Sequence, residues 1–379
     1  MPRLTAVNRL LRELVARPSI NPTFLPDRPE LTGEERVAEF LAETARSAGI
    51  EVRRQAVLPG RKNLIARISP SGKVRKRIML TPHMDVVPAS GSAFRPKVRN
   101  GRMYGRGTCD TKGSVSAFFS AFLDLARKGP LPRETEILFV GLVDEEFGQA
   151  GSRRLAEKGP VGDLAVAGEP TGLKVVSSHK GNLWLRLKTQ GKSAHGSTPQ
   201  HGRNAIAAMG PVLDFLFDEY PKILARKSHP LLGSPTLSVG KIIGGTQPNV
   251  VPDECTIDLD RRTIPGESEA SVKKEMVKAL KAKGIASPSF CLSRSVPCLP
   301  LDTDPDLPLV RSFLRAAGKR KPTGVPYFTD ASPIATGGTP ALVFGPGNIA
   351  QAHSDDEWVE LEQVERAHAI VSRFLGSLP

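Results

Sequence analysis

Four short apolar runs are spread along the chain, and each predicts a buried β-strand. They are RIML at residues 77–80, ETEILFV at 134–140, LAVA at 164–167 and PALVF at 340–344. Residues 114–127 have apolar positions at helical spacing instead, and so do residues 4–14 near the N-terminus. Strands that alternate with helices predict an α/β domain built on an open sheet.

The pattern changes between residues 177 and 291. Segments 183–189, 236–243, 255–261 and 287–292 are strand-like, whereas 204–217 and 271–282 have helical spacing. In chain order these segments read β-α-β-β-α-β, which predicts a small ferredoxin-like α+β domain. We therefore expect two domains: a discontinuous catalytic domain of residues 1–176 and 292–379, and an inserted domain of residues 177–291.

His83 and Asp85 lie two residues apart in the run TPHMDVV, at the end of the first predicted strand. In an extended chain, residues i and i+2 share a face, so the carboxylate can hold the imidazole while the imidazole binds a metal. A lone His-x-Asp pair is more often a hydrogen-bonded loop pair. The metal interpretation therefore depends on what the rest of the chain supplies.

The other strands supply further metal-binding side chains. Glu145 and Glu146 follow the second strand, Glu169 follows the third, and His353 lies one loop after the fourth, while Asp110 precedes the helix at 114–127. In open α/β sheets, sites form beyond the carboxyl ends of the strands. These residues can therefore converge although they are far apart in sequence.

Two imidazoles and three carboxylates form a donor set that suits two Zn²⁺ ions sharing one bridging carboxylate, with a position left open for water. The set is His83, Asp110, Glu146, Glu169 and His353. Adjacent buried glutamates repel each other unless cations or donors compensate. A structural zinc site is less consistent with the sequence, because the four cysteines have no C-x₂-C spacing.

Several blocks of sequence, in this order, resemble the M20 metallopeptidase family, the group of acetylornithine deacetylase, succinyl-diaminopimelate desuccinylase, aminoacylase and glutamate carboxypeptidase. They are HMD, GRGTCDTKG, DEEFGQAGS, GEPTG, GKSAHGSTPQHGRNAI, PNVVP, DLDRRTIPG and GPGNIAQAH. The resemblance spans nearly the whole chain, and one departure is Ser114, where family members often have a second glycine. The resemblance implies a catalytic domain with the α/β sandwich of the zinc peptidases. It also implies that the inserted domain is a lid and dimerisation domain, and hence that the protein is a homodimer.

The resemblance also implies which residues hold which ion. Asp110 would bridge two Zn²⁺ ions, which Co²⁺ can replace. His83 and Glu169 would complete one ion, and Glu146 and His353 would complete the other.

Three further residues receive catalytic roles from the resemblance. Asp85 would orient His83, and Glu145 would be the general base that takes a proton from the attacking water and passes it to the leaving amine. His195 matches the family histidine that reaches into the partner's active site and stabilises the tetrahedral oxyanion. From its surroundings alone, His195 has a second interpretation, which is that it structures a Gly/Pro-rich loop.

Asn249 and Arg262 resemble residues that position the substrate. The fork of an arginine recognises a carboxylate through two hydrogen bonds, as an enzyme acting on N-acyl amino acids requires. Arg261 is the neighbouring alternative, and either arginine can instead pair with Asp258 or Asp260.

Composition and charge narrow the class of protein. The net charge of +14 raises nucleic acid as a competing partner, but the basic clusters at 73–77, 226–227 and 319–321 are short, separate and not interleaved with aromatic residues. The charge can instead attract anionic N-acyl amino acids. The sequence shows no signal-peptide core, no run long enough to span a membrane and no patterned cysteines. We expect a cytoplasmic protein with no nucleic-acid or membrane partner.

The leading hypothesis is a dimeric two-metal amidohydrolase that cleaves an N-acyl-L-amino acid, most like an acetylornithine deacetylase of arginine biosynthesis. The block at 345–353, followed by Asp356 and Glu357, resembles that branch. The alternatives are a succinyl-diaminopimelate desuccinylase, a dipeptidase or carboxypeptidase that cleaves short peptides, and a non-catalytic binding protein on the same fold. Asp330 supports the site, meets a cationic substrate or caps a turn.

Overall fold

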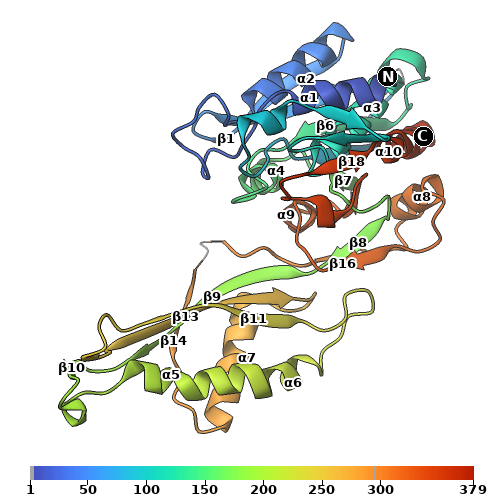
Figure 1. Ribbon diagram of the computed structural model, residues 1–379. Helices are drawn as coiled ribbons and strands as arrows, with labels where there is room; N and C mark the ends of the chain where they lie inside the picture. Colours follow the sequence, from blue (N-terminus) through green and yellow to red (C-terminus); the bar gives the residue numbers. More distant parts are fainter. Residues whose placement is uncertain (1–3, 294–295) are drawn as a thin grey trace. The chain divides into compact units, whose positions relative to one another are not determined.

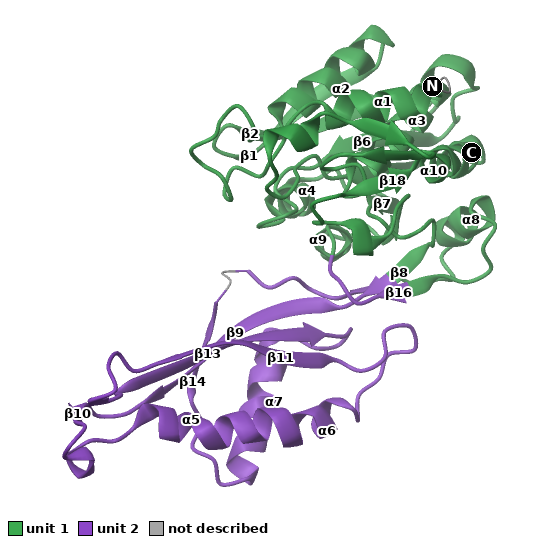
Figure 2. Ribbon diagram, viewed as in Figure 1, with its two compact units in different colours: residues 1–177, 303–323, 329–379 green, residues 178–302, 324–328 purple. Residues whose placement is uncertain are grey.

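The structure, a computed structural model, describes residues 4–293 and 296–379 and divides into two compact units (Figure 2). Unit 1 comprises residues 1–177, 303–323 and 329–379, and unit 2 comprises residues 178–302 and 324–328. Unit 2 therefore extends beyond the expected boundary at residue 291. The physical reason is that residues 298–302 pair with residues 178–182 before the chain returns to unit 1.

A mixed sheet whose central strands are parallel forms the centre of unit 1 (Figure 1). Its strands, in spatial order, are β1 (Glu51–Leu58), β2 (Arg61–Ile68), β6 (Thr135–Gly141), β3 (Lys76–Pro82), β7 (Leu164–Gly168) and β17 (Ala341–Phe344), followed by β8 (Val176–His179). The pairs β6–β3, β3–β7 and β7–β17 are parallel, and the outer pairs are antiparallel. All the residues of β6, β7 and β17 are buried, which explains why these strands are continuous apolar runs in the sequence.

Helices cover both faces of this sheet. They are α1 (Ala6–Val15), α2 (Glu35–Ser47), α3 (Lys112–Lys128), α4 (Ala150–Lys158), α8 (Pro308–Ala316), α9 (Ala331–Thr336) and α10 (Leu361–Gly376). Alternate residues of the strands, such as Ile78 and Leu80 of β3, form one core with α1, α2, α3 and α10. α4 and α9 pack against each other, and α9 also contacts β7 and β17. The result is the α/β sandwich expected for the catalytic domain.

A small antiparallel sheet also belongs to unit 1. It contains β4 (Lys97–Arg99), β5 (Arg102–Tyr104) and β18 (Trp358–Glu360), with β5 in the middle. β5 leads into the loop that carries Asp110, and β18 follows the loop that carries His353. The small sheet thus joins two segments that are far apart in sequence.

Unit 2 has the ferredoxin-like order of elements. They are β9 (Gly181–Gln190), α5 (Ala205–Asp214), β11 (Thr236–Gly244), β13 (Glu254–Thr263), α7 (Glu269–Ala282) and β14 (Ser289–Leu292), and the strand order in the sheet is β11-β13-β9-β14. Asn204 caps α5 by accepting from the main-chain N–H groups of Ile206 and Ala207. The helix predicted at 204–217 continues as a π-helical turn, Phe215–Glu219, and α6 (Tyr220–Leu224). Shorter strands are β10 (Ala194–His195), β12 (Val250–Val251), β15 (Leu301–Asp302) and β16 (Thr323–Val325).

Within residues 4–293 and 296–379, none of the helices combines the length and apolar character needed to cross a bilayer. The four cysteines, Cys109, Cys255, Cys291 and Cys298, all carry free thiols.

Candidate metal centre

The parallel register of the central strands brings the predicted site residues to one edge of the sheet. Pro82 at the end of β3 pairs with Gly168 at the end of β7, and His83 forms a bridge with Leu142 just after β6. The side chains that follow these strands, those of His83, the Glu145–Glu146 pair and Glu169, therefore leave the sheet at the same level.

Five side chains of unit 1 form two groups that share Asp110. In the first, His83 Nε2 lies 3.1 Å from Asp110 Oδ1 and 3.9 Å from Glu169 Oε1. In the second, His353 Nε2 lies 3.1 Å from Glu146 Oε2 and 3.3 Å from Asp110 Oδ2. Within each group, one potential ligand atom per residue lies within 4.8 Å of the others. The structure thus brings together the five residues predicted from the sequence, in the two groups that the family resemblance implies.

The surroundings of His83 favour one tautomer of its neutral ring. Its Nδ1 lies 3.0 Å from the main-chain oxygen of Asp85, and a carbonyl oxygen can only accept a hydrogen bond. In the neutral ring Nδ1 therefore carries the proton, which would leave the lone pair of Nε2 for a metal ion between the ring and the carboxylates of Asp110 and Glu169. The Asp85 carboxylate, expected to hold the imidazole, is farther away, at 3.6 Å from Nδ1. Both the main-chain oxygen and the carboxylate of Asp85 therefore lie beside Nδ1, and the main-chain oxygen is the nearer of the two.

The Asp85 carboxylate instead fixes the backbone of the two neighbouring glutamates. Its Oδ1 accepts from the main-chain N–H of Glu145 at 3.1 Å, and its Oδ2 accepts from that of Glu146 at 3.1 Å. The amide of Asn21 donates to the same Oδ2 at 2.8 Å. One fully buried carboxylate therefore orients both the proposed base and one proposed ligand.

A second layer of buried polar residues was missed by the sequence analysis. The Asn21 amide also donates to Asp144 Oδ1 at 3.0 Å, and Arg61 donates to the same oxygen at 2.8 Å. Arg61 pairs in addition with the buried Glu34, whose carboxylate accepts from the main-chain N–H of Asp144. Asp144 adopts a positive φ of 69°, which is uncommon for a residue other than glycine. Two signals were available: Asp144 directly precedes Glu145, and Asn21 closes the block PSIN near the N-terminus.

The electrostatics of the site fit bound divalent cations. Burial and the charge of Asp110 raise the pKa of Glu146 to about 7, and the same causes raise the pKa of Glu169 well above its ordinary value. Burial, followed by the charge of Glu169, also raises the pKa of Glu145. Glu146 Oε1 is buried and has no hydrogen-bond partner. Cations would stabilise these carboxylates in their ionised form, so the donor set suits metal rather than a self-contained hydrogen-bond network.

The histidines respond to the same carboxylates. Hydrogen bonds to Asp110 and Glu146 raise the pKa of His353 to about 10. Burial alone would raise the pKa of Asp110, but hydrogen bonds from His353 and His83 outweigh it and hold this pKa below its ordinary value. The imidazoles and the Asp110 carboxylate thus stabilise each other's charged forms.

Asp330 lies near this group but does not cap a turn. It precedes α9, and its side chain makes no capping hydrogen bond to that helix. Its Oδ1 accepts from the hydroxyl of Ser152, while its buried Oδ2 has no partner. Its charge contributes to the raised pKa values of Glu145 and Glu169. The turn-capping interpretation was therefore wrong.

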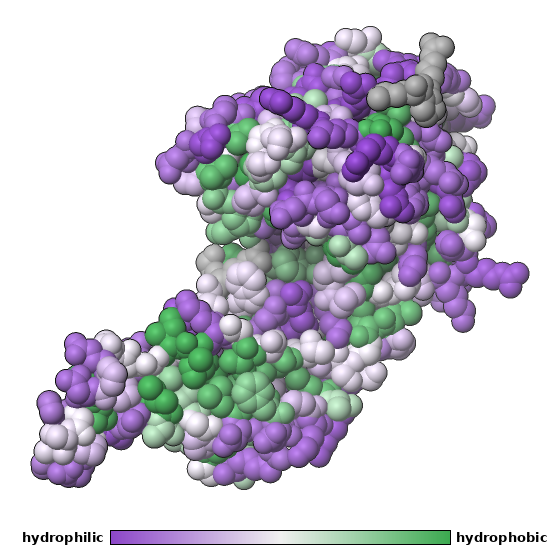
Figure 3. Space-filling view, viewed as in Figure 1, coloured by the Kyte–Doolittle hydropathy of each residue, from purple (hydrophilic) through white to green (hydrophobic). Residues whose placement is uncertain are grey.

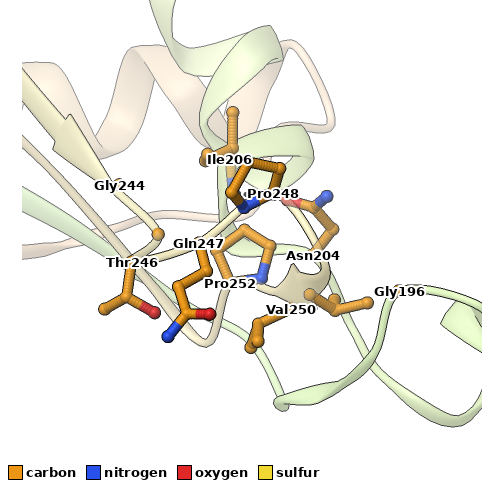
Figure 4. Close-up of a pocket in the computed structure, with 11 residues that line it drawn as sticks. Gly196, Asn204, Ile206, Gly244, Thr246, Gln247, Pro248, Val250 and Pro252 are labelled. Atoms are coloured by element: carbon orange, nitrogen blue, oxygen red, sulfur yellow. Dashed lines mark hydrogen bonds between the residues drawn. The ribbon is translucent and has the colours of Figure 1, made fainter.

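The other predicted residues belong to unit 2. β10 pairs with β12, and the main-chain N–H of Gly196 donates to the oxygen of Asn249, so His195 and Asn249 lie on one short ribbon. A cavity of about 530 Å³ borders this ribbon and is lined by Gly196, Asn204, Ile206, residues 244–248 and residues 250–252 (Figure 4).

The exposed imidazole of His195 is held by its neighbour Ser197. Its Nδ1 accepts from the main-chain N–H of Ser197 at 3.2 Å and lies 2.7 Å from the hydroxyl of the same residue. The proton of the neutral ring is therefore on Nε2, which remains available as a hydrogen-bond donor.

The two candidate arginines have different environments. Arg261 is fully buried and pairs with Glu267 at 2.7 Å, so it is a structural residue. Arg262 is partly exposed and makes a bidentate contact with Asp260, at 2.9 and 3.0 Å. Of the two, Arg262 is the one whose guanidinium has solvent access, although an aspartate already occupies its fork.

Comparison with known proteins identifies the family. The sequence profile of peptidase family M20/M25/M40 matches residues 79–377. The chain belongs to this family. An acetylornithine deacetylase from Vibrio atlanticus is 31% identical over 354 residues, which cover 90% of this chain and 91% of that protein. As a member of this family, this chain is a metal-dependent hydrolase that acts on amide bonds.

Solved M20 structures share the two-domain fold. A metallo-carboxypeptidase from Sulfolobus solfataricus has a TM-score of 0.76 and 20% identity, with 98% of this chain and 99% of that chain covered. A dinuclear metal-binding peptidase from Bacillus subtilis has a TM-score of 0.72 and 15% identity, with 98% and 96% covered. At these identities the comparison concerns the fold.

Proposed function

We propose that this M20 hydrolase removes the acyl group of an Nα-acyl-L-amino acid, with Nα-acetylornithine as the first candidate substrate. The observation that carries the proposal is the pair of three-residue groups that share Asp110, with Glu145 beside them and outside both. The similarity to an acetylornithine deacetylase over nine-tenths of both chains directs the choice of substrate. Such an enzyme would supply ornithine for arginine biosynthesis, and its free thiols suit a cytoplasmic location.

In this proposal, His83, Asp110 and Glu169 would hold one ion, and Asp110, Glu146 and His353 would hold the other. Carboxylate and imidazole donors suit Zn²⁺, and Co²⁺ accepts the same ligands. When bound, the ions supply a Lewis acid for the scissile carbonyl and make hydroxide available near neutral pH.

Glu145 is the proposed general base. It is buried, with 8% exposed, and its main-chain N–H is fixed by Asp85. Its carboxylate belongs to neither three-residue group, so it remains free to take a proton from the attacking water and deliver it to the leaving amine. His195 is the proposed donor to the oxyanion, because its Nε2 carries the proton of the neutral ring.

Asp330 and Arg262 are proposed to recognise the charged groups of the substrate. The free Oδ2 of Asp330 would accept from the side-chain ammonium of an amino acid such as ornithine. Arg262 would exchange its contact with Asp260 for the α-carboxylate of the substrate, and Asn249 would position the acyl amide.

A homodimer is proposed from the exposed edge of unit 2. β11 is the outermost strand of its sheet, and its Ile242 and Ile243 are about half exposed, at 53% and 54%. Apolar side chains gather on the face of unit 2 seen in Figure 3. An unpaired strand edge with apolar neighbours is suited to pairing with a second copy of itself.

Mixing two inactive chains tests whether His195 acts across this interface. His195→Ala keeps Glu145, and Glu145→Gln keeps His195, so a mixed dimer would contain one complete site if the histidine acts in trans. Co-expression is then expected to restore about a quarter of the wild-type rate, if the subunits pair at random. Activity no higher than that of the two separate variants would show that His195 acts within its own chain or not in catalysis.

The proposed substrate class is tested by amine release from a panel, with and without chelator. We expect the Zn²⁺- or Co²⁺-loaded protein to hydrolyse Nα-acetylornithine, and to hydrolyse its neutral analogue Nα-acetylnorleucine more slowly because Asp330 would lose its partner. Chelator should abolish both activities. Preference for N-succinyl-diaminopimelate would move the protein to the desuccinylases, and cleavage of dipeptides alone would move it to the peptidases. No turnover of any compound would favour a binding protein.

A further inference from the structure

Glu357 joins the two loops that carry residues of the candidate metal centre. It lies shortly after His353 and directly before β18, and its side chain is only 1% exposed. Its carboxylate faces the loop of residues 105–110, which leads from β5 to Asp110. The main-chain oxygen of Glu357 also accepts from the N–H of Gly105 at 2.9 Å.

Four donors from this loop converge on the Glu357 carboxylate. Oε1 accepts from the main-chain N–H groups of Cys109 at 2.8 Å and Asp110 at 3.0 Å. Oε2 accepts from the main-chain N–H of Gly107 at 2.9 Å and from Nη1 of Arg106 at 2.8 Å. Both oxygens are thus fully engaged with donors, and one of these donors is the amide of Asp110 itself.

The loop turns at a glycine whose side of the chain is crowded. Gly107 has a φ of 86°, and a Cβ at this position would lie 3.0 Å from Lys112 Cδ and from Val86 Cγ1. A glycine here permits the turn but contributes no side chain to fix it. The buried Glu357 carboxylate is the one side-chain group that engages the main-chain N–H groups of Gly107, Cys109 and Asp110 together among the described residues, and only a group that accepts at both oxygens can satisfy all four donors.

Asp110 is the one residue that belongs to both three-residue groups of the described chain. A shift of its main chain would move Oδ1 away from His83 and Oδ2 away from His353 together. Glu357 itself belongs to neither group, and its oxygens point to the loop rather than to the ligand atoms.

We propose that Glu357 is a positioning residue that sets the place of Asp110, so that its loss weakens the binding of both ions together. This inference rests on the proposed metal-dependent function. It differs from a general contribution to folding, because it concerns the affinity and ligand geometry of a folded protein.

The test compares Glu357→Gln with Asp356→Asn, which removes the same charge at an exposed neighbouring position. Glutamine has the same shape, but its amide N–H₂ would face two donors of the loop. Metal-free protein is titrated with Zn²⁺ against a chromogenic chelator, and with Co²⁺ while the visible spectrum is recorded. For Glu357→Gln we expect the affinity for both ions to fall by roughly 10- to 100-fold, with an altered Co²⁺ spectrum. Asp356→Asn should match the wild type.

Arg106→Gln provides a second, milder variant in case Glu357→Gln does not fold. It removes one of the four donors to Glu357 and should lower the affinity for both ions, but by less than Glu357→Gln does. Unchanged affinities and spectra in a folded variant would overturn the inference, and so would the loss of one ion alone. A wild-type protein that binds no metal would instead contradict the proposed function, so the two failures can be told apart.

Discussion

Glu145→Gln is expected to lower kcat by about 10²- to 10⁴-fold, the usual contribution of a general base. The amide is isosteric with the carboxyl group, so the contacts of the Glu145 main chain with Asp85 should persist. Because Glu145 belongs to neither three-residue group, the metal content should stay close to that of the wild type. Turnover of Nα-acetylornithine and metal analysis of the same preparation check the two expectations.

The pH dependence of the two proteins should differ in a definite direction. Burial and the charge of Glu169 raise the pKa of Glu145. A base works only when ionised, so kcat/KM of the wild type should rise as the pH increases through the pKa of this group. The residual activity of Glu145→Gln should lack that acid limb. Glu157→Gln, whose side chain on α4 is 66% exposed, is the control and should keep both rate and profile. Near-normal turnover by Glu145→Gln would remove Glu145 from the role of base.

The convergence of the candidate ligands was predictable because it follows from one rule of sheet geometry. His83, Glu145 and Glu169 each follow a buried apolar run, and the carboxyl ends of parallel strands meet at one edge of a sheet. Ferredoxin-like unit 2 was similarly visible, because its strands and helices alternate with clear periodicity. Such local patterns predict the elements correctly because the apolar positions that make the pattern are the ones that form the core.

The supporting contacts were not predictable from those patterns. Asn21 lies in a loop, and Arg61 is the first residue of β2, so neither residue follows an apolar run that would mark it as part of the site. The spacing of His83 and Asp85 placed the Asp85 carboxylate beside the ring, but it did not predict the shorter contact from the main-chain oxygen of Asp85. Glu357 acts on main-chain N–H groups 247–250 residues away, and such contacts leave no residue-type signal in the partner segment.

Asp110→Asn is expected to reduce the metal content from about two ions per chain to nearly none and to abolish amidase activity. Asp110 offers Oδ1 to the group of His83 and Oδ2 to the group of His353, and a neutral amide can supply only one oxygen. His353→Ala should behave differently, because it leaves His83, Asp110 and Glu169 in place and should retain one ion. Metal analysis after exhaustive dialysis, together with amine release, distinguishes the two variants.

The contrast between these variants is the informative result. Asp306→Asn, whose side chain is 74% exposed, serves as the control for loss of a negative charge and should bind metal normally. If Asp110→Asn keeps both ions, Asp110 does not bridge, and the two groups are separate sites that happen to be adjacent. If His353→Ala loses both ions, the sites depend on each other more strongly than their ligand sets require. A shared carboxylate predicts that Asp110→Asn loses more metal than His353→Ala, because Asp110 belongs to both groups and His353 to one.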